Sequence, residues 1–69
     1  MIWVDHETWS PLRQQFEYEW IVLGLWKLDD YLNLSSHEWV GKYPHPDYGI
    51  NLYFKDPVDE LAFKLKYTL

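Results

Sequence analysis

Three short stretches place a histidine beside carboxylates, and they are the first candidates for metal binding or acid–base chemistry. They are Asp5-His6-Glu7, His37-Glu38 and His45-Pro46-Asp47. Imidazole nitrogens and carboxylate oxygens bind zinc and similar ions, but the spacing of these stretches matches no recurrent metal site. All three are expected in loops or at the ends of elements. We therefore interpret them as surface residues, and predict neither a metal site nor another cofactor.

The residue types and spacings do not indicate a catalytic site. Catalysis by paired carboxylates needs two acids held across a cleft, whereas Asp29 and Asp30 are neighbours in the chain. The three glycines are isolated and form no phosphate-binding loop. The chain has no cysteine, and no serine has the context of a nucleophile. We predict that the protein is not an enzyme.

Aromatic side chains in irregular segments are the remaining candidates for function. Five Trp, six Tyr and three Phe in 69 residues provide more aromatic surface than a core of this size easily buries. Trp and Tyr are frequent among the residues that dominate binding energy. With nearby acids they predict an aromatic patch with an acidic rim, which binds a basic, partly apolar surface of another protein. Its predicted members are Asp29, Asp30, Tyr31, Glu38, Trp39, Tyr43 and Tyr48.

The negative charge of the chain lies in its first part. The formal net charge is −5; residues 1–41 hold seven acids and two bases, and residues 42–69 hold four of each. An acidic surface repels phosphates, so direct binding of nucleic acid is not expected. Two alternatives to an interaction protein stay open. One is a nucleic-acid mimic whose acids occupy a DNA- or RNA-binding cleft, and the other is a homodimer that hides surplus aromatic surface.

Neither a signal peptide nor a membrane span is expected. Met1 is followed by neither a basic region nor a long apolar run. The longest apolar stretch, Trp20 to Trp26, is too short to cross a bilayer. The sequence favours a soluble, cytoplasmic protein that does not contact a membrane.

The first half of the chain predicts a strand followed by a helix. Residues 1–4 are short, apolar and β-prone, and Ser10-Pro11 is a helix-start signal, with a hydroxyl cap before a proline at the first helical position. An apolar residue then recurs with helical spacing, at Leu12, Phe16, Trp20 and Leu23. The stretch from Trp20 to Trp26 is apolar on all sides, typical of a buried helix end or a central strand. We favour the helix, with Gly24 allowing close packing against a neighbour.

The second half predicts a hairpin, a helix and a last strand. Ser35 to Glu38 has the form of a capping box, but Trp39-Val40 can instead open a strand, and residues 39–54 then form a hairpin with a wide, Pro-rich loop. Residues 50–54 alternate between apolar and polar, as in a half-buried strand. Asp56-Pro57 starts a helix, which is expected to give way near Lys64 to a short terminal strand.

These elements predict a small single α+β domain over residues 1–69. The expected order is approximately β-α-β-β-α-β, with the helices packed on one face of an antiparallel sheet.

The tail of the chain carries a resemblance. Tyr48-Gly49, Leu52 to Pro57, Asp59 and Phe63 to Tyr67 together resemble the C-terminus of many small uncharacterised bacteriophage proteins. The chain departs from that pattern at Glu60, where those proteins usually have alanine. The resemblance implies a phage origin and a small α+β domain, and it implies no activity. It favours a host or phage protein as the partner, and the cytoplasm of the host cell as the location.

Overall fold

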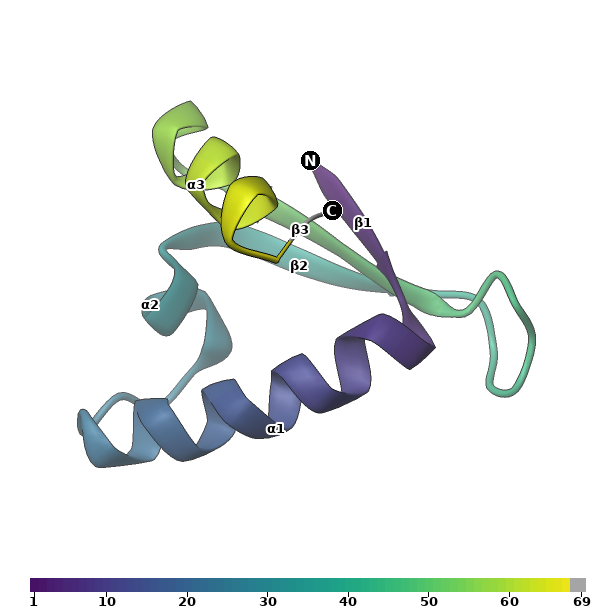
Figure 1. The fold of residues 1–69 in the computed structure, drawn as a ribbon, viewed down its shortest axis with the longest axis horizontal. Helices are drawn as coiled ribbons and strands as arrows, with labels where there is room; N and C mark the ends of the chain where they lie inside the picture. The colour runs from purple at the N-terminus through teal and green to yellow at the C-terminus, as the bar shows by residue number, and fades with distance from the viewer. Residues whose placement is uncertain (68–69) are drawn as a thin grey trace.

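The computed structural model describes residues 1–67, which form a three-stranded antiparallel sheet and three helices. In chain order the elements are β1 (Ile2–Asp5), α1 (His6–Val22), α2 (Leu28–Leu32), β2 (Leu34–Val40), β3 (Gly49–Phe54) and α3 (Pro57–Tyr67) (Figure 1). The predicted α+β class is confirmed, as are the first strand and the hairpin with its Pro-rich loop. The short helix α2 was not predicted.

The central strand of the sheet is β3, with β1 on one side and β2 on the other. Ile2 lies opposite Leu52 in the β1–β3 pair, and Trp39 lies opposite Ile50 in the β2–β3 pair. Because side chains alternate between the two faces of a strand, these four residues all point to the same face of the sheet.

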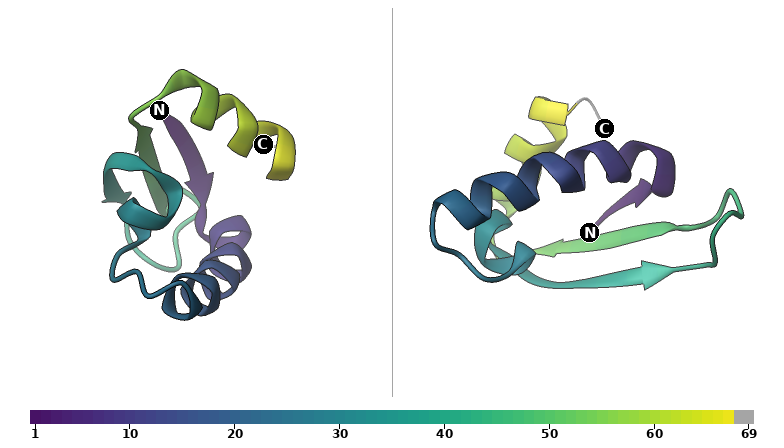
Figure 2. Two further views of the ribbon diagram at one scale, coloured as in Figure 1. Left: turned by 90° about the vertical axis from the view of Figure 1, so that its left-hand side faces the viewer. Right: turned by 90° about the horizontal axis from the view of Figure 1, so that it is seen from below.

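That face carries the core, and all three helices contribute to it, whereas two helices on one face were predicted. In the right-hand view of Figure 2, α1 lies alongside the strands and runs roughly parallel to them. The buried residues come from all six elements: Ile2, Val4, Trp9, Phe16, Leu28, Leu34, Ile50, Leu52 and Phe63. Of the aromatic residues that their spacing places on apolar faces, Phe16 is fully buried, whereas Trp20 and Phe54 pack against the edge of the core.

The opposite face of the sheet holds a close contact between β1 and β3. The Trp3 ring lies over Gly49, where a Cβ atom would meet Trp3 Cζ2 at 2.8 Å and the Val4 carbonyl oxygen at 2.5 Å. Glycine is required at position 49 because any side chain would collide with both groups. This contact fixes the point at which β3 begins, directly after the loop of residues 41–48.

The predicted start of α1 at Ser10-Pro11 is wrong, because the helix begins earlier, at His6. Asp5 is the N-cap, and its carboxylate accepts a hydrogen bond from the backbone N–H of Thr8 at 2.7 Å. Pro11 lies within the helix and does not interrupt it. The Asp5 cap is the last residue of β1, so the helix follows the first strand without an intervening loop.

The end of α1 is a tight turn at Gly24. The N–H of Gly24 donates to the carbonyl of Ile21, and the N–H of Leu25 donates to the carbonyl of Trp20. These two bonds define a Schellman motif, which places a residue in the left-handed region at Gly24, with φ of +77°. The favoured helix therefore ends at Val22, and a Cβ atom at position 24 would meet nothing within 4 Å. The expectation that Gly24 packs closely against a neighbour is wrong, since the glycine serves the backbone turn.

Replacing Gly24 by alanine is expected to destabilise the protein by about 1 kcal/mol, through backbone strain at positive φ alone. For a domain of this size this loss lowers Tm by roughly 4–8 °C. Asparagine tolerates the left-handed region better, so Gly24→Asn should lose less than Gly24→Ala. Thermal unfolding followed by circular dichroism measures both variants. Equal stability of wild type and Gly24→Ala would contradict the assigned role of the turn.

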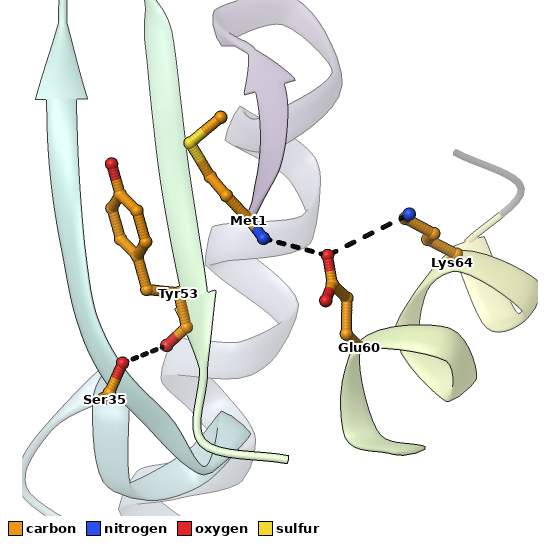
Figure 3. A network of polar contacts seen from close by, with 5 residues as sticks. All are labelled: Met1, Ser35, Tyr53, Glu60 and Lys64. Carbon is orange, nitrogen blue, oxygen red and sulfur yellow. Dashed lines mark hydrogen bonds and ion pairs between the residues drawn. The ribbon is translucent and has the colours of Figure 1, made fainter. Parts of the chain in front are cut away.

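Two later elements differ from expectation. Ser35 to Glu38 belongs to strand β2 and not to a helical turn, so β2 begins at Leu34 and ends at Val40. The ladder is irregular between Leu34 and Ser36, where the Ser35 hydroxyl donates to the Tyr53 carbonyl at 2.9 Å (Figure 3). As a result His37 lies in the middle of a strand, and the expectation of a loop or element end is wrong for this histidine.

Helix α3 begins as predicted, with the Asp56 carboxylate accepting from the backbone N–H of Val58 at 2.9 Å. The predicted strand from Lys64 is wrong within the described residues, since the helix continues to Tyr67; residues 68–69 lie outside them. Phe63 is buried and packs against Tyr67 one turn later, with 4.8 Å between ring centroids. Glu60 links α3 to the start of β1 through an ion pair with the Met1 ammonium group at 3.0 Å (Figure 3). It also pairs with Lys64, one turn later in the same helix, at 3.9 Å.

Candidate partner-binding site

Four aromatic rings gather where α1 begins beside the loop between β2 and β3. We call these residues, His6, Trp39, Tyr43 and Tyr48, the loop cluster. The His6 ring centroid lies 4.9 Å from that of Tyr43 and 5.0 Å from that of Tyr48. The Trp39 and Tyr48 rings are stacked, with an interplanar angle of 14° and 5.8 Å between centroids. The cluster therefore joins the start of α1 to the end of β2 and the loop that follows it, which lie far along the chain from His6.

Backbone hydrogen bonds hold the cluster in position. The N–H of His6 donates to the carbonyl of Tyr48 at 2.9 Å, which ties the start of α1 to the end of the loop. Within the loop, the N–H of His45 donates to the Lys42 carbonyl, and the N–H of Tyr48 donates to the His45 carbonyl. Trp39 is anchored from below by the edge of the buried Trp9 ring, 6.5 Å between centroids. The rings are thus supported by the sheet and by the core.

The cluster remains accessible from outside. Tyr43 is 68% exposed and Trp39 is 44% exposed. A hollow of about 430 Å³ opens beside them, lined by Tyr43, Tyr48 and His6, and by Asp5, Glu7, Pro44, His45 and Pro46. Its wall therefore combines aromatic faces with two carboxylates, a combination that attracts cationic side chains, and Arg above all.

One of those carboxylates is held in its charged form. The backbone N–H of Thr8 donates to the Asp5 carboxylate, and this hydrogen bond keeps the pKa of Asp5 below its ordinary value. Because the negative charge also faces the positive end of the α1 dipole, the same group stabilises the helix start and gives the hollow a fixed negative charge.

Replacing Asp5 by alanine is expected to remove about 1 kcal/mol of stability at pH 7 by deleting the cap. Since the folded-state pKa is lowered, the stabilisation due to charge is present above the unfolded pKa and is lost as the pH falls below about 4. The difference in stability between wild type and Asp5→Ala should therefore be smaller at pH 3 than at pH 7. Asp5→Asn caps about as well but does not titrate. Melting curves at pH 7 and pH 3 measure this difference in stability, and a difference that is larger at pH 3 would contradict the prediction.

The structure divides the seven residues of the predicted patch among three places. Trp39, Tyr43 and Tyr48 come together in the loop cluster. Asp29, Asp30 and Tyr31 belong to α2, which lies at the opposite end of the molecule from the loop in Figure 1. Glu38 lies opposite Asn51, on the face of the sheet that the helices do not cover. The seven residues lie in one stretch of the sequence, residues 29–48, but do not form one surface.

Two of these α2 residues, Asp29 and Tyr31, already have partners within the chain. The Asp29 carboxylate accepts a hydrogen bond from His37 Nδ1 at 2.6 Å, and the Tyr31 hydroxyl donates to Glu19. The Tyr31 ring is half-buried and packs against Phe16, with 5.5 Å between centroids. These contacts fasten α2 to β2 and α1, which is a structural role.

His6 belongs to the site although the sequence analysis treated it as an ordinary surface residue. A signal for its role was present, since it follows the β-prone first strand and lies between two acids, but the partner rings come from residues far along the chain. Within residues 1–67, no three His, Asp or Glu side chains come close enough to hold a metal ion.

Comparisons with known proteins provide no further information about this site. No protein-family model matches the chain, and neither the curated proteins nor the solved structures contain a significant match. In the part of the chain that the structure describes, none of the helices has both the length and the apolar character needed to cross a membrane.

Proposed function

We propose that this protein is a non-enzymatic binding module that takes a basic, partly apolar segment of another protein into the hollow of the loop cluster. By occupying that segment, the protein blocks or redirects its partner. The proposal requires no cofactor and no catalytic group.

The observation that carries this proposal is that the exposed Tyr43 lines one hollow with the acidic residues Asp5 and Glu7. The exposed Trp39 stacks on Tyr48, which also lines that hollow. The face of an aromatic ring attracts an ammonium or guanidinium group, and the attraction increases when water is excluded. Pro44 and Pro46 restrict the backbone of the loop, so the site loses little conformational entropy when a ligand binds.

Charge supports the same kind of partner. The chain has a net charge of −5, so a basic protein is attracted from a distance and an acidic one is repelled. If the chain is encoded by a phage, as the resemblance of its tail implies, the partner is a host or phage protein in the cytoplasm of the infected cell.

Selection from a displayed library of short random peptides tests the proposal. The expected result is enrichment of peptides that carry Arg or Lys next to an apolar residue. A parallel selection on Tyr43→Ala, which removes an exposed ring from the hollow, is the control and should lose that enrichment. Selection of acidic or purely apolar peptides, or of the same peptides by both proteins, would overturn the proposal.

A further inference from the structure

The last turns of α1 expose a second apolar surface, which is separate from the loop cluster. Its members are Tyr18, Ile21, Val22, Leu23 and Trp26, each between 65% and 90% exposed, and we call them the α1-end patch. The stretch from Trp20 to Trp26 was expected to be the buried end of the helix, and this expectation is wrong for most of its residues.

Helical spacing explains why the patch faces outward. At 100° per residue, Tyr18, Ile21 and Val22 lie on the side of α1 opposite to Phe16, which packs into the core. Beyond the helix, Leu23 lines a shallow hollow with Tyr18, Val22 and Glu19, and Trp26 lines a second hollow with Ile21 and Gly24. The Schellman turn thus places Leu23 and Trp26 next to the exposed residues of the helix. Since the turn is held by two backbone hydrogen bonds, the patch has a defined shape.

The outward side of α1 also lacks charge for more than three turns. Between Pro11 and Val22, the exposed residues on the side opposite Phe16 carry no charge at neutral pH; they are Pro11, Gln14, Gln15, Tyr18, Ile21 and Val22. The exposed charged residues of this span, Arg13 and Glu17, lie on the flank of the helix. In a chain with a net charge of −5, such a surface is where two copies can meet without bringing carboxylates together. A basic partner, in contrast, would gain no electrostatic attraction here.

The size of the patch suits a contact between two copies. Two aromatic and three aliphatic side chains at these exposures present roughly 600–800 Å². A standard protein interface uses about 800 Å² from each partner. A two-fold contact of this surface with itself therefore reaches the size of a specific interface when the glutamines beside it are included.

We infer that two copies of this chain associate through the outward side of α1, with the α1-end patch of one copy on that of the other across a two-fold axis. His6 and Val22 lie at opposite ends of α1, about 24 Å apart along the helix axis. The two loop clusters consequently stay uncovered at the outer ends of the dimer. The dimer is thus bivalent, and it would bind tandem or oligomeric targets more tightly than one copy does.

Sedimentation velocity tests this inference. A range of protein concentrations up to about 1 mM covers weak to tight self-association. We expect wild type to pass from monomer to dimer. The double variant Ile21→Glu, Val22→Glu should weaken dimerisation by about 100-fold or more, because the interface would bury unpaired carboxylates. Both positions are exposed in the monomer, so the fold should persist, and circular dichroism verifies it.

The matched control is Leu61→Glu, on the exposed side of α3 and also apolar. It should dimerise as wild type does. The inference would be overturned if the wild-type protein stayed monomeric at every concentration. It would also be overturned if Leu61→Glu abolished dimerisation while the α1 variant still formed the dimer. Peptide binding by the loop cluster should be unchanged in the α1 variant, so this test and that of the proposed function succeed or fail separately.

Discussion

Replacing Phe16 by alanine is expected to leave the protein largely unfolded near its physiological temperature. Phe16 has no exposed surface. Its ring centroid lies 5.5 Å from those of Tyr31 and Tyr67, 5.9 Å from that of Trp9 and 6.3 Å from that of Phe63. This one side chain therefore joins α1 to α2 and α3.

The expected magnitude follows from the cavity that the substitution leaves. Removing a buried phenylalanine side chain typically costs about 3–5 kcal/mol, whereas a domain of this length has roughly 3–10 kcal/mol in total. Tm should consequently fall by about 15 °C or more. Thermal unfolding followed by near-ultraviolet circular dichroism measures the loss.

The matched control lies two residues later on the same helix. Tyr18 is also aromatic but is 73% exposed, so Tyr18→Ala should change stability by no more than about 0.5 kcal/mol at concentrations where the protein is monomeric. Similar losses for the two variants would show that the aromatic core is not organised around Phe16.

The second large effect is expected on binding. The double variant Trp39→Ala, Tyr43→Ala should weaken the affinity for a selected basic peptide by about 100-fold or more, since each aromatic hot spot contributes about 1–2 kcal/mol or more. Tyr43 lines the hollow and contacts His6 edge-on, and Trp39 stacks on Tyr48, another residue of the lining. The variant therefore removes one wall of the hollow and the ring that supports a second. Isothermal titration calorimetry gives the two dissociation constants.

Trp26→Ala provides the control for this comparison, because Trp26 is 90% exposed and lies beyond the far end of α1. Its affinity for the peptide should equal that of wild type. If Trp26→Ala weakened binding as much as the double variant does, nonspecific hydrophobic contacts and not the loop cluster would account for the affinity.

Local signals in the sequence identified one helix start correctly and another incorrectly. Asp56-Pro57 predicts the start of α3, and α3 begins there. Ser10-Pro11 does not mark the start of α1, because Asp5 at the end of β1 caps the helix and Pro11 is accommodated within it. The tail was ambiguous because Phe63, Leu65 and Tyr67 alternate. The structure buries Phe63, half-buries Tyr67 and exposes Leu65, which is a helical pattern.

Burial and the binding site were harder to predict because they depend on distant contacts. The apolar stretch Trp20 to Trp26 looked like core, but within residues 1–67 the sheet has three strands and does not extend under the end of α1 (Figure 1). The predicted patch lies between residues 29 and 48 of the sequence, yet β2 carries the chain from α2 to the loop at the other end of the molecule. Only the three-dimensional structure brings His6 to Tyr43 and Tyr48.

The most direct measurement is a nuclear magnetic resonance titration of isotope-labelled protein with a short peptide that alternates arginine and leucine. The Ile21→Glu, Val22→Glu background keeps the protein monomeric during the experiment. Our account predicts saturable shift changes centred on the backbone amides of His6, Glu7, Tyr43 and Tyr48, with α2 unaffected. Changes centred on Asp29 and Asp30, or no saturable change at the loop cluster, would contradict it.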